Sequence, residues 1–352
     1  MSLVFSGMGS QWPGMGKKLF KANEIFRQTI TECEISLKRI CDLSLIDFFT
    51  NAHDREPEID TLQIIIFSIQ LGILEILKRR GLKPSSVVGH SLGEISAAYA
   101  AGILSLDDAV RIVRFRSKDL ARLRGRGTML MVLAGAETLD ATIKNLNLRV
   151  DISGYNAKNM TTVSGSFEDI QCFRNELERI EVSTATMNVD IPFHGRFIDE
   201  LLAEFRKNIE GVTFRNAEIP FFSTVTGRKM EDHFMTVEYW LSNLRNPVLF
   251  YQAMSVMNEG QFFLEISPHA VLSGAVGKSC IKTLVRGQDD EISLNNTLEE
   301  LQKHALLTTN RFNMDLTKNL SLVENFLLQN PGPQLQILLD ELRDLNFYLD
   351  RA

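Results

Sequence analysis

Residues 86–101, Ser-Val-Val-Gly-His-Ser-Leu-Gly-Glu-Ile-Ser-Ala-Ala-Tyr-Ala-Ala, predict a short buried strand, a tight turn and a helix of small residues. Gly89 and Gly93 flank Ser91 two residues away on either side, which gives the pattern Gly-x-Ser-x-Gly. A strand before this pattern and a helix after it are the context in which a serine is presented at the end of a parallel strand. The stretch therefore predicts an α/β fold with Ser91 at the carboxyl edge of its sheet.

Strand and helix signals alternate on both sides of this stretch. Residues 3–5 predict a short strand, residues 59–80 a long apolar helix and residues 107–122 a further helix. Ser105, with Asp108 three residues later, has the spacing of a capping pair at the start of that last helix. Strands that alternate with helices favour a parallel sheet.

The order of the predicted elements changes at Gly127. From there, about sixty residues predict strand, helix, two strands, helix and strand, which is the ferredoxin-like order. The earlier pattern returns afterwards, so the small unit is expected to be inserted into the large one. The expected parts are a large α/β subdomain over residues 1–126 and 190–307, a small subdomain over residues 127–189, and a C-terminal linker or docking helix over residues 308–352.

Composition argues against several classes of protein. The formal net charge is −6 and the isoelectric point is near 5.6, whereas a nucleic-acid binder usually carries the opposite charge. The longest uninterrupted apolar run, residues 129–134, is too short to cross a bilayer, and no signal peptide precedes the first predicted strand. The 4 cysteines lack Cys-x-x-Cys spacing, which argues against a zinc site or a disulfide framework. We expect a cytoplasmic protein without nucleic-acid or membrane partners and without a metal site.

Ser91 has the position of a nucleophile, and a nucleophilic serine needs a base. The N–H of Leu92, at the start of the following helix, can face a developing oxyanion. Among the 6 histidines, His90 adjoins the serine and is expected to point away from it. His194 lies where the inserted unit returns to the large subdomain, at a seam that favours a cleft. His269, in a Ser-Pro-His turn, is its best rival.

Arg116 occupies an unexpected face of its predicted helix. At about 100° per residue, it falls among apolar residues, opposite Arg111 and Lys118. A buried arginine without a partner is strongly destabilising, and its planar guanidinium suits a carboxylate through two parallel hydrogen bonds. The carboxylate could come from the protein or from a ligand, and a side chain that extends to solvent is a third alternative.

A glycine-rich turn, residues 5–11 with the sequence Phe-Ser-Gly-Met-Gly-Ser-Gln, follows the first predicted strand. Such a turn can bring backbone N–H groups close to a ligand. A phosphate loop is not indicated, because Gly16-Lys17 is followed by Lys18 rather than by serine or threonine.

Five separated motifs together resemble those of malonyl-CoA:acyl-carrier-protein transacylases and of the acyltransferase domains of fatty acid and polyketide synthases. The resemblance covers roughly residues 3–305. The motifs, in order, are Gly7-Met8-Gly9-Ser10-Gln11, Gly89-His90-Ser91-Leu92-Gly93-Glu94, Arg116, Phe193-His194 and Asn246-Pro247-Val248. The resemblance implies an α/β-hydrolase-like large subdomain with a parallel sheet and an inserted ferredoxin-like small subdomain.

The resemblance also implies an activity. The protein would move a malonyl group from malonyl-CoA to the phosphopantetheine thiol of an acyl carrier protein, in fatty acid or polyketide biosynthesis. The acyl group would be carried as an ester of Ser91 in a ping-pong reaction that needs no metal and no permanently bound cofactor. Neighbouring synthase domains are implied as further partners.

Single residues receive roles from the same resemblance. Ser91 is the implied nucleophile, and His194 is the implied base, oriented by the backbone carbonyl of Asn246. The other implied features are an oxyanion hole from the N–H groups of Gln11 and Leu92, a carboxylate site at Arg116, and pocket or selectivity positions at Met8, Gln63, Ile191 and Phe193.

Three residues depart from the family pattern. These departures bear on which acyl group the protein selects more than on the type of reaction. Met8 replaces the glutamine common in bacterial stand-alone enzymes, as it does in animal fatty acid synthases. Phe193 is typical of malonyl-selective domains, but Ile191 and Pro192 fit neither the malonyl nor the methylmalonyl pattern. Gly195 stands where serine is usual, which could loosen the loop that carries the histidine.

Three alternatives stay open at this point: the same transferase selective for another acyl-CoA, a hydrolase that clears stalled acyl chains from carrier proteins, and a non-catalytic scaffold. Arg116 argues against the hydrolase, because such relatives typically lack a carboxylate-binding arginine. A patatin-like lipase would pair its serine with an Asp-Gly motif, and the chain contains no Asp-Gly.

A docking patch for the carrier protein is a further expectation. Carrier proteins are usually acidic and this chain is acidic overall, so the patch must be local. The candidates are Lys17-Lys18, Lys78-Arg79-Arg80, and Arg122, Arg124 and Arg126. A solvated charged face is an equally good interpretation of each candidate.

Overall fold

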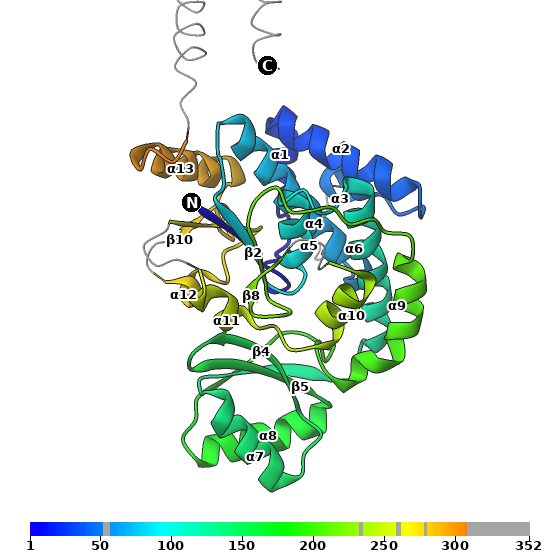
Figure 1. Cartoon of the computed structure of the whole chain (residues 1–352), viewed down its shortest axis with the longest axis vertical. Helices are drawn as coiled ribbons and strands as arrows, with labels where there is room; N and C mark the ends of the chain where they lie inside the picture. Colours follow the sequence, from blue (N-terminus) through cyan, green and yellow to red (C-terminus); the bar gives the residue numbers. More distant parts are fainter. Residues whose placement is uncertain (52–56, 232–234, 258–261, 278–279, 308–352) are drawn as a thin grey trace, which may run out of the picture.

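Two β-sheets organise the part of the chain that the computed structural model describes, which is residues 1–51, 57–231, 235–257, 262–277 and 280–307. The larger sheet has the strand order β10-β9-β1-β2-β7-β8. Its strands are β1 (Ser2–Phe5), β2 (Ser86–Gly89), β7 (Phe221–Ser223), β8 (Arg228–Lys229), β9 (Phe263–Ile266) and β10 (Cys280–Lys282). All neighbours pair in parallel except β7 and β8. The predicted α/β class with a parallel sheet is confirmed (Figure 1).

The two central strands, β1 and β2, are buried on both faces. Leu3, Val4 and Phe5 have no exposed surface, and neither do Val87 and Val88. Continuous apolar runs of this kind are typical of parallel strands that helices cover on both sides. The register sets the end of β2 beside the ends of β1 and β9, so the turn that follows β2 leaves the sheet at its carboxyl edge.

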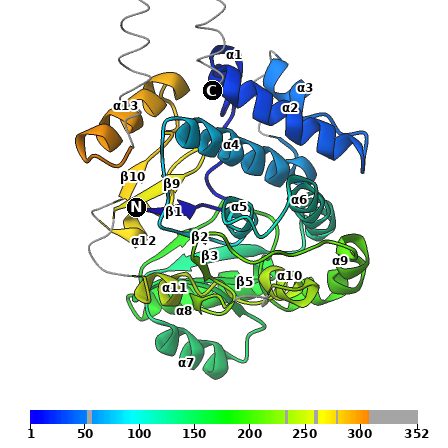
Figure 2. The ribbon, with the colours of Figure 1, turned by 45° about the horizontal axis from the view of Figure 1, so that its top comes forward.

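Helices cover both faces of the large sheet (Figures 1 and 2). The α-helices of the N-terminal third are α1 (Lys17–Ala22), α2 (Glu24–Lys38), α3 (Leu45–Thr50), α4 (Ile59–Arg79), α5 (Gly93–Ala100) and α6 (Leu106–Leu120), and the 3-10 helix η1 (Ala121–Leu123) follows α6. Side chains alternate along β1, so Leu3 and Phe5 pack with α4 and α5, while Val4 packs with α11 on the opposite face.

The helices of the later part of the large unit complete this arrangement. They are η2 (Arg196–Leu201), α9 (Leu202–Ile209), α10 (Val237–Arg245), α11 (Phe250–Ser255), α12 (Ser273–Val276) and α13 (Asp290–Lys303). Helix α9 packs against α6 and α10, and α13 packs against α1. Segments from both ends of the described chain therefore enclose one core.

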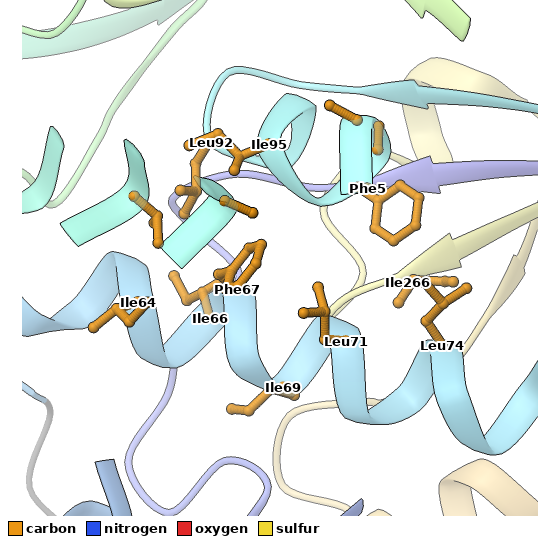
Figure 3. Close-up of a cluster of buried hydrophobic side chains, with 14 of the residues drawn as sticks. Phe5, Ile64, Ile66, Phe67, Ile69, Leu71, Leu74, Leu92, Ile95 and Ile266 are labelled. Atoms are coloured by element: carbon orange, nitrogen blue, oxygen red, sulfur yellow. The ribbon is translucent and has the colours of Figure 1, made fainter. Parts of the chain in front are cut away.

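Helix α4 is the centre of that core. Figure 3 shows Phe67, Leu71 and Leu74 pointing from α4 toward side chains of β1, β9 and α5. Ile69 points to the other side of the helix and is also fully buried. By length and composition α4 could cross a membrane, but 78% of its most apolar window is buried inside the protein. Other elements of the protein therefore cover α4 on nearly all sides.

The smaller sheet has the strand order β4-β5-β3-β6, and all its pairs are antiparallel. Its elements along the chain are β3 (Thr128–Val132), α7 (Ala136–Leu146), β4 (Asp151–Ala157), β5 (Met160–Gly165), α8 (Phe167–Arg179) and β6 (Thr184–Thr186). Figure 1 shows this unit at one end of the molecule, below α10 and α11. Helix α11 packs on β4, which brings the two units into direct contact.

The strands of the two sheets come from different parts of the chain. All strands of the smaller sheet lie between residues 128 and 186, and the larger sheet takes strands from both sides of that segment. The exact boundaries stay a prediction. The expected linker or docking helix over residues 308–352 lies outside the described residues.

Candidate active site

The turn between β2 and α5 holds Ser91 in a strained backbone conformation. Its φ angle is 54°, which is unfavourable for a residue other than glycine. A Cβ on Gly89 would lie 2.3 Å from the carbonyl oxygen of Gly93, and a Cβ on Gly93 would lie 2.1 Å from that of Phe5. Only glycine fits at both positions, and this explains the local Gly-x-Ser-x-Gly pattern.

Ser91 and His194 lie in direct contact. The Ser91 Oγ is 2.7 Å from Nε2 of His194, and Nδ1 of His194 is 3.0 Å from the carbonyl oxygen of Asn246. A carbonyl only accepts, so Nδ1 carries the hydrogen and Nε2 is free to accept the serine proton. The rival histidine, His269, accepts a hydrogen bond from the N–H of Arg286 through Nδ1 instead.

The surroundings of His194 keep its imidazole neutral. Burial lowers its pKa to about 3, the positive charge of Arg116 and the neighbouring His90 act in the same direction, and the bond to Asn246 opposes them. Only 4% of the residue is exposed. A neutral imidazole is the form that can remove a proton from Ser91.

An NMR titration can measure this protonation state. We expect one ring, absent from the spectrum of a His194→Gln variant, to keep neutral-imidazole shifts from pH 8 down to about pH 5. Free histidine would be mostly protonated at that pH, because its pKa is about 6.5. A histidine-labelled sample provides the measurement. A His194 ring that titrates between about pH 6 and 7 would contradict the assigned environment.

Arg116 is buried and contacts the nucleophile. Its Nη2 donates to Ser91 Oγ over 2.9 Å, its Nη1 donates to Gln63 Oε1 over 2.5 Å, and only 1% of the residue is exposed. Burial lowers its pKa to about 10, against the effect of Glu94, so the side chain stays charged at neutral pH. None of the ion pairs among the described residues includes Arg116.

Two donors beside the serine have no partner. Arg116 Nε and Gln63 Nε2 are buried, and neither makes a hydrogen bond within the described part of the chain. Unsatisfied buried donors are costly, and these two belong to side chains that bond to each other next to Ser91 Oγ. An anionic group with two acceptor oxygens would satisfy them.

The residues expected to form the oxyanion hole lie on adjoining segments. Leu92 caps the N-terminus of α5, where the helix dipole favours negative charge. The glycine-rich turn packs tightly on this point, since a Cβ on Gly7 would lie 2.7 Å from the carbonyl oxygen of His90 and 3.5 Å from the nitrogen of Leu92. Gln11 closes the turn by accepting from the N–H of Gly9 through Oε1.

A cavity of about 210 Å³ opens beside the glycine-rich turn and the segment that leads to His194. Its apolar wall includes Met8, Leu62, Ile191 and Phe193, and Gln11 also lines it. The three expected selectivity positions Met8, Ile191 and Phe193 therefore share one wall, while Gln63 lies at Arg116 instead. At the charged rim of the cavity, Arg124 bridges Glu58 and Asp190.

Gly195 leaves space for a carboxylate of the small unit. A Cβ there would lie 2.8 Å from Asp151 Oδ2 and 3.0 Å from Ser164 Oγ. Asp151 accepts from the backbone N–H of Arg196 and forms a two-pronged ion pair with its guanidinium, with distances of 2.8 to 3.1 Å. Ser164 Oγ donates to the carbonyl of His194 over 3.2 Å. The loop with the histidine is thus anchored where the sequence suggested that it could be loose.

We expect Gly195→Ser to destabilise the protein. The new Cβ would displace Asp151 from Arg196, and overpacking of this kind costs about 1–3 kcal/mol. Differential scanning calorimetry should show Tm lowered by roughly 2–10 °C. Gly274→Ser is the matched control, because a Cβ at Gly274 meets nothing within 4 Å. Equal Tm values for the two variants would contradict this account.

Most of the candidate docking residues already have acidic partners. Lys18 pairs with Asp289, Arg122 with Glu204, Arg124 with Glu58 and Asp190, Arg126 with Glu200, and Lys78 with Glu75. These pairs reduce the local positive charge that an acidic carrier would meet. The docking patch stays a prediction.

Two buried residues near the serine received no role from the sequence. Glu94 follows Ser91 by three residues and Asn243 lies in α10, and the two side chains are hydrogen-bonded to each other. The signal for Glu94 was a carboxylate in a helix of otherwise small and apolar residues, where burial requires partners. No comparable signal marks Asn243.

Comparisons with known proteins identify a family. A family model described as "Acyl transferase domain" matches residues 2–318. Erythronolide synthase EryA2 of Saccharopolyspora erythraea is 33% identical over 81% of the chain, and polyketide synthase GfsB of Streptomyces halstedii is 34% identical over 86%. The chain spans only 8% and 6% of those two proteins.

Solved structures show the same fold. A loading acyltransferase from the avermectin modular polyketide synthase superposes with a TM-score of 0.80 at 29% identity, covering 86% of this chain and 99% of the other. A malonyl CoA-acyl carrier protein transacylase from Clostridium perfringens superposes with a TM-score of 0.77 at 24% identity, covering 87% and 98%. The second likeness concerns the fold alone.

Proposed function

The chain belongs to the acyl transferase domain family, and we propose that it moves a malonyl group from malonyl-CoA, through an ester on Ser91, to the phosphopantetheine thiol of an acyl carrier protein. The proposed setting is polyketide or fatty acid biosynthesis in the cytoplasm, with neighbouring synthase domains as partners. The large unit would then be α/β-hydrolase-like and the small one a ferredoxin-like insertion, which their strand orders support.

The unpartnered donors of Arg116 and Gln63 carry this proposal. The free carboxylate of a malonyl group offers two acceptor oxygens, which match Arg116 Nε and Gln63 Nε2. Its thioester carbonyl lies two carbon atoms away, within reach of Ser91 Oγ, which Arg116 already contacts. A neutral acyl group would leave the buried guanidinium without an anion.

In the first half-reaction, Ser91 becomes acylated. His194 Nε2 takes the hydroxyl proton while Ser91 Oγ bonds to the thioester carbon. The resulting oxyanion accepts from the N–H groups of Gln11 and Leu92, and each such donor is worth about 3 kcal/mol in the transition state. When the tetrahedral centre collapses, the carbon–sulfur bond breaks, and CoA leaves with the proton from His194.

The second half-reaction runs through the same groups. His194 removes the proton of the phosphopantetheine thiol, and the sulfur attacks the carbonyl carbon of the Ser91 ester. Collapse breaks the ester bond and returns the proton to Ser91 Oγ. Arg116 holds the malonyl carboxylate through both steps, so the acyl group stays in place while one thiol replaces the other.

A transfer assay tests the proposal against its alternatives. The protein would be incubated with malonyl-, methylmalonyl- or acetyl-CoA and a phosphopantetheinylated carrier protein, and both products would be weighed by intact-mass spectrometry. We expect malonyl carrier protein from the malonyl-CoA reaction. Transfer from methylmalonyl-CoA alone would replace the proposed substrate. Release of CoA together with free acid, and no acyl carrier, would favour the hydrolase.

A further inference from the structure

Glu94, in the first turn of α5, is a fully buried carboxylate with three donors. Its Oε1 accepts from the backbone N–H of Thr224 and from Tyr239 Oη, both over 2.7 Å, and its Oε2 accepts from Asn243 Nδ2 over 2.6 Å. No part of the residue is exposed. The steps assigned to Ser91 and His194 make no use of this group.

The direction of each hydrogen bond defines the form of Glu94. Ser223 Oγ accepts from the N–H groups of Val225 and Thr226, so its own hydrogen points to Tyr239 Oη, 2.7 Å away. Tyr239 must then donate to Glu94. All three partners of the carboxyl group are donors, which fits the ionised form. Burial raises the pKa of Glu94 to about 7, against the effect of these bonds.

Asn243 connects this carboxylate to the nucleophile. Its Nδ2 also donates to the backbone carbonyl of Ser91 over 3.3 Å, so its two amide hydrogens serve Glu94 and Ser91. Asn243 lies in α10, and the carbonyl of Asn246, the C-cap of that helix, orients His194. The end of α10 thereby contacts both members of the Ser91–His194 pair.

We propose that Glu94 and Asn243 are positioning residues, which fix the backbone of Ser91 relative to the end of α10 that orients His194. The strained φ of Ser91 needs surrounding contacts to hold it, and the Asn243 amide supplies one at the carbonyl of that residue. Glu94 holds the amide in the orientation that donates to Ser91. The inference rests on the proposed nucleophile–base pair but not on the identity of the acyl group.

Glu94→Gln should release the Asn243 amide from this orientation with little change in the shape of the side chain. The new side chain can keep its oxygen toward Thr224 and Tyr239, but its NH₂ group then faces the NH₂ group of Asn243. The Asn243 amide must turn away, and its contact with Ser91 is lost. Misplacement of reacting groups by about 1 Å can lower a rate by roughly a hundredfold.

A fluorophosphonate probe measures the alignment of the pair without malonyl-CoA. Ser91 Oγ bonds to phosphorus, fluoride leaves, and His194 takes the hydroxyl proton, so no carboxylate site is needed. At pH 8 we expect Glu94→Gln to react about ten to a hundred times more slowly than the unchanged protein. An equal rate would overturn the inference, whatever the protein does with malonyl-CoA.

A double variant separates positioning from folding. In Glu94→Gln/Asn243→Asp, the new carboxylate accepts from the new amide, so the link between the two side chains returns with its polarity reversed. The group facing the Ser91 carbonyl is then an acceptor. We expect Tm to recover toward that of the unchanged protein while the labelling rate stays low.

Two further results complete the test. Recovery of both Tm and rate in the double variant would overturn the inference and leave Glu94 with a folding role. Thr297→Val in α13 is the stability control, because Thr297 is buried and its hydroxyl bonds only to backbone carbonyls of its own region. Its labelling rate should equal that of the unchanged protein, and a similar loss there would count against positioning.

Discussion

Ser91→Ala is expected to abolish acyl loading and to lower turnover by about 10⁶-fold, the loss seen when a serine enzyme is deprived of its nucleophile. Alanine removes the only atom that can form the ester, while the N–H groups of Gln11 and Leu92 remain. The backbone conformation is retained, because alanine adds nothing that serine lacked. Steady-state release of CoA from malonyl-CoA measures the effect.

The folded state of this variant needs its own control. Ser91 Oγ bonds to His194 and Arg116, so the alanine variant leaves two buried groups with one partner fewer. We expect circular dichroism to remain unchanged and Tm to fall by only a few degrees. Turnover within tenfold of the unchanged protein would show that another residue forms the acyl intermediate.

The second large effect is expected for Arg116→Ala. Removing one partner of a buried charged pair costs about 3–5 kcal/mol, which corresponds to roughly 10²- to 10⁴-fold slower malonyl loading. Acetyl loading should fall little or rise, since an acetyl group has no carboxylate to bind. Rates of acyl-protein formation from the two CoA esters, measured side by side, give the ratio that reports the role of Arg116.

Lys118→Ala is the matched control for this prediction. Lys118 lies two residues further along α6 and is exposed, whereas Arg116 is buried. Both substitutions remove one positive charge from the same helix, so a general electrostatic effect would appear in both. If the two variants load malonyl groups at equal rates, Arg116 does not bind the substrate carboxylate.

Local sequence patterns were enough to predict the turn at Ser91. The glycines at positions 89 and 93 are required by close backbone contacts within that turn and with β1, so the pattern carries its own structural reason. Helical periodicity likewise placed Arg116 on the buried face of α6. The periodicity left open whether the partner of Arg116 is a carboxylate of the protein or of a ligand. In the structure, the guanidinium of Arg116 bonds to Ser91 and Gln63, and its Nε has no partner among the described residues.

Long-range partners could not be predicted in the same way. Glu94 is held by Thr224, Tyr239 and Asn243, which are at least 130 residues away in the chain. Gly195 is likewise in contact with Asp151, a residue distant from it in the chain. Charged segments that suggested a docking patch turned out to pair with acidic residues from other elements. Such contacts arise from the packing of distant elements, which leaves no periodic signal.

Element lengths also depended on tertiary contacts. The last strand expected in the small unit is short, because β6 covers only Thr184–Thr186. Beyond it, Asn188, Val189 and Asp190 line the same cavity as Met8 and Phe193. The uninterrupted apolar run used to judge membrane spanning overlooked α4, whose apolar residues are interrupted by single polar ones such as Gln70. That glutamine bonds to backbone carbonyls of Ser6 and Ile266 inside the core.

The measurement that tests the central claim most directly is peptide mapping of the acyl intermediate. The protein would be mixed briefly with malonyl-CoA, quenched in acid, digested and analysed by tandem mass spectrometry. The account predicts one malonyl ester, located on Ser91 and absent from both the Ser91→Ala and the Arg116→Ala proteins. A malonyl group on any other residue, or CoA release without an ester on Ser91, would contradict it.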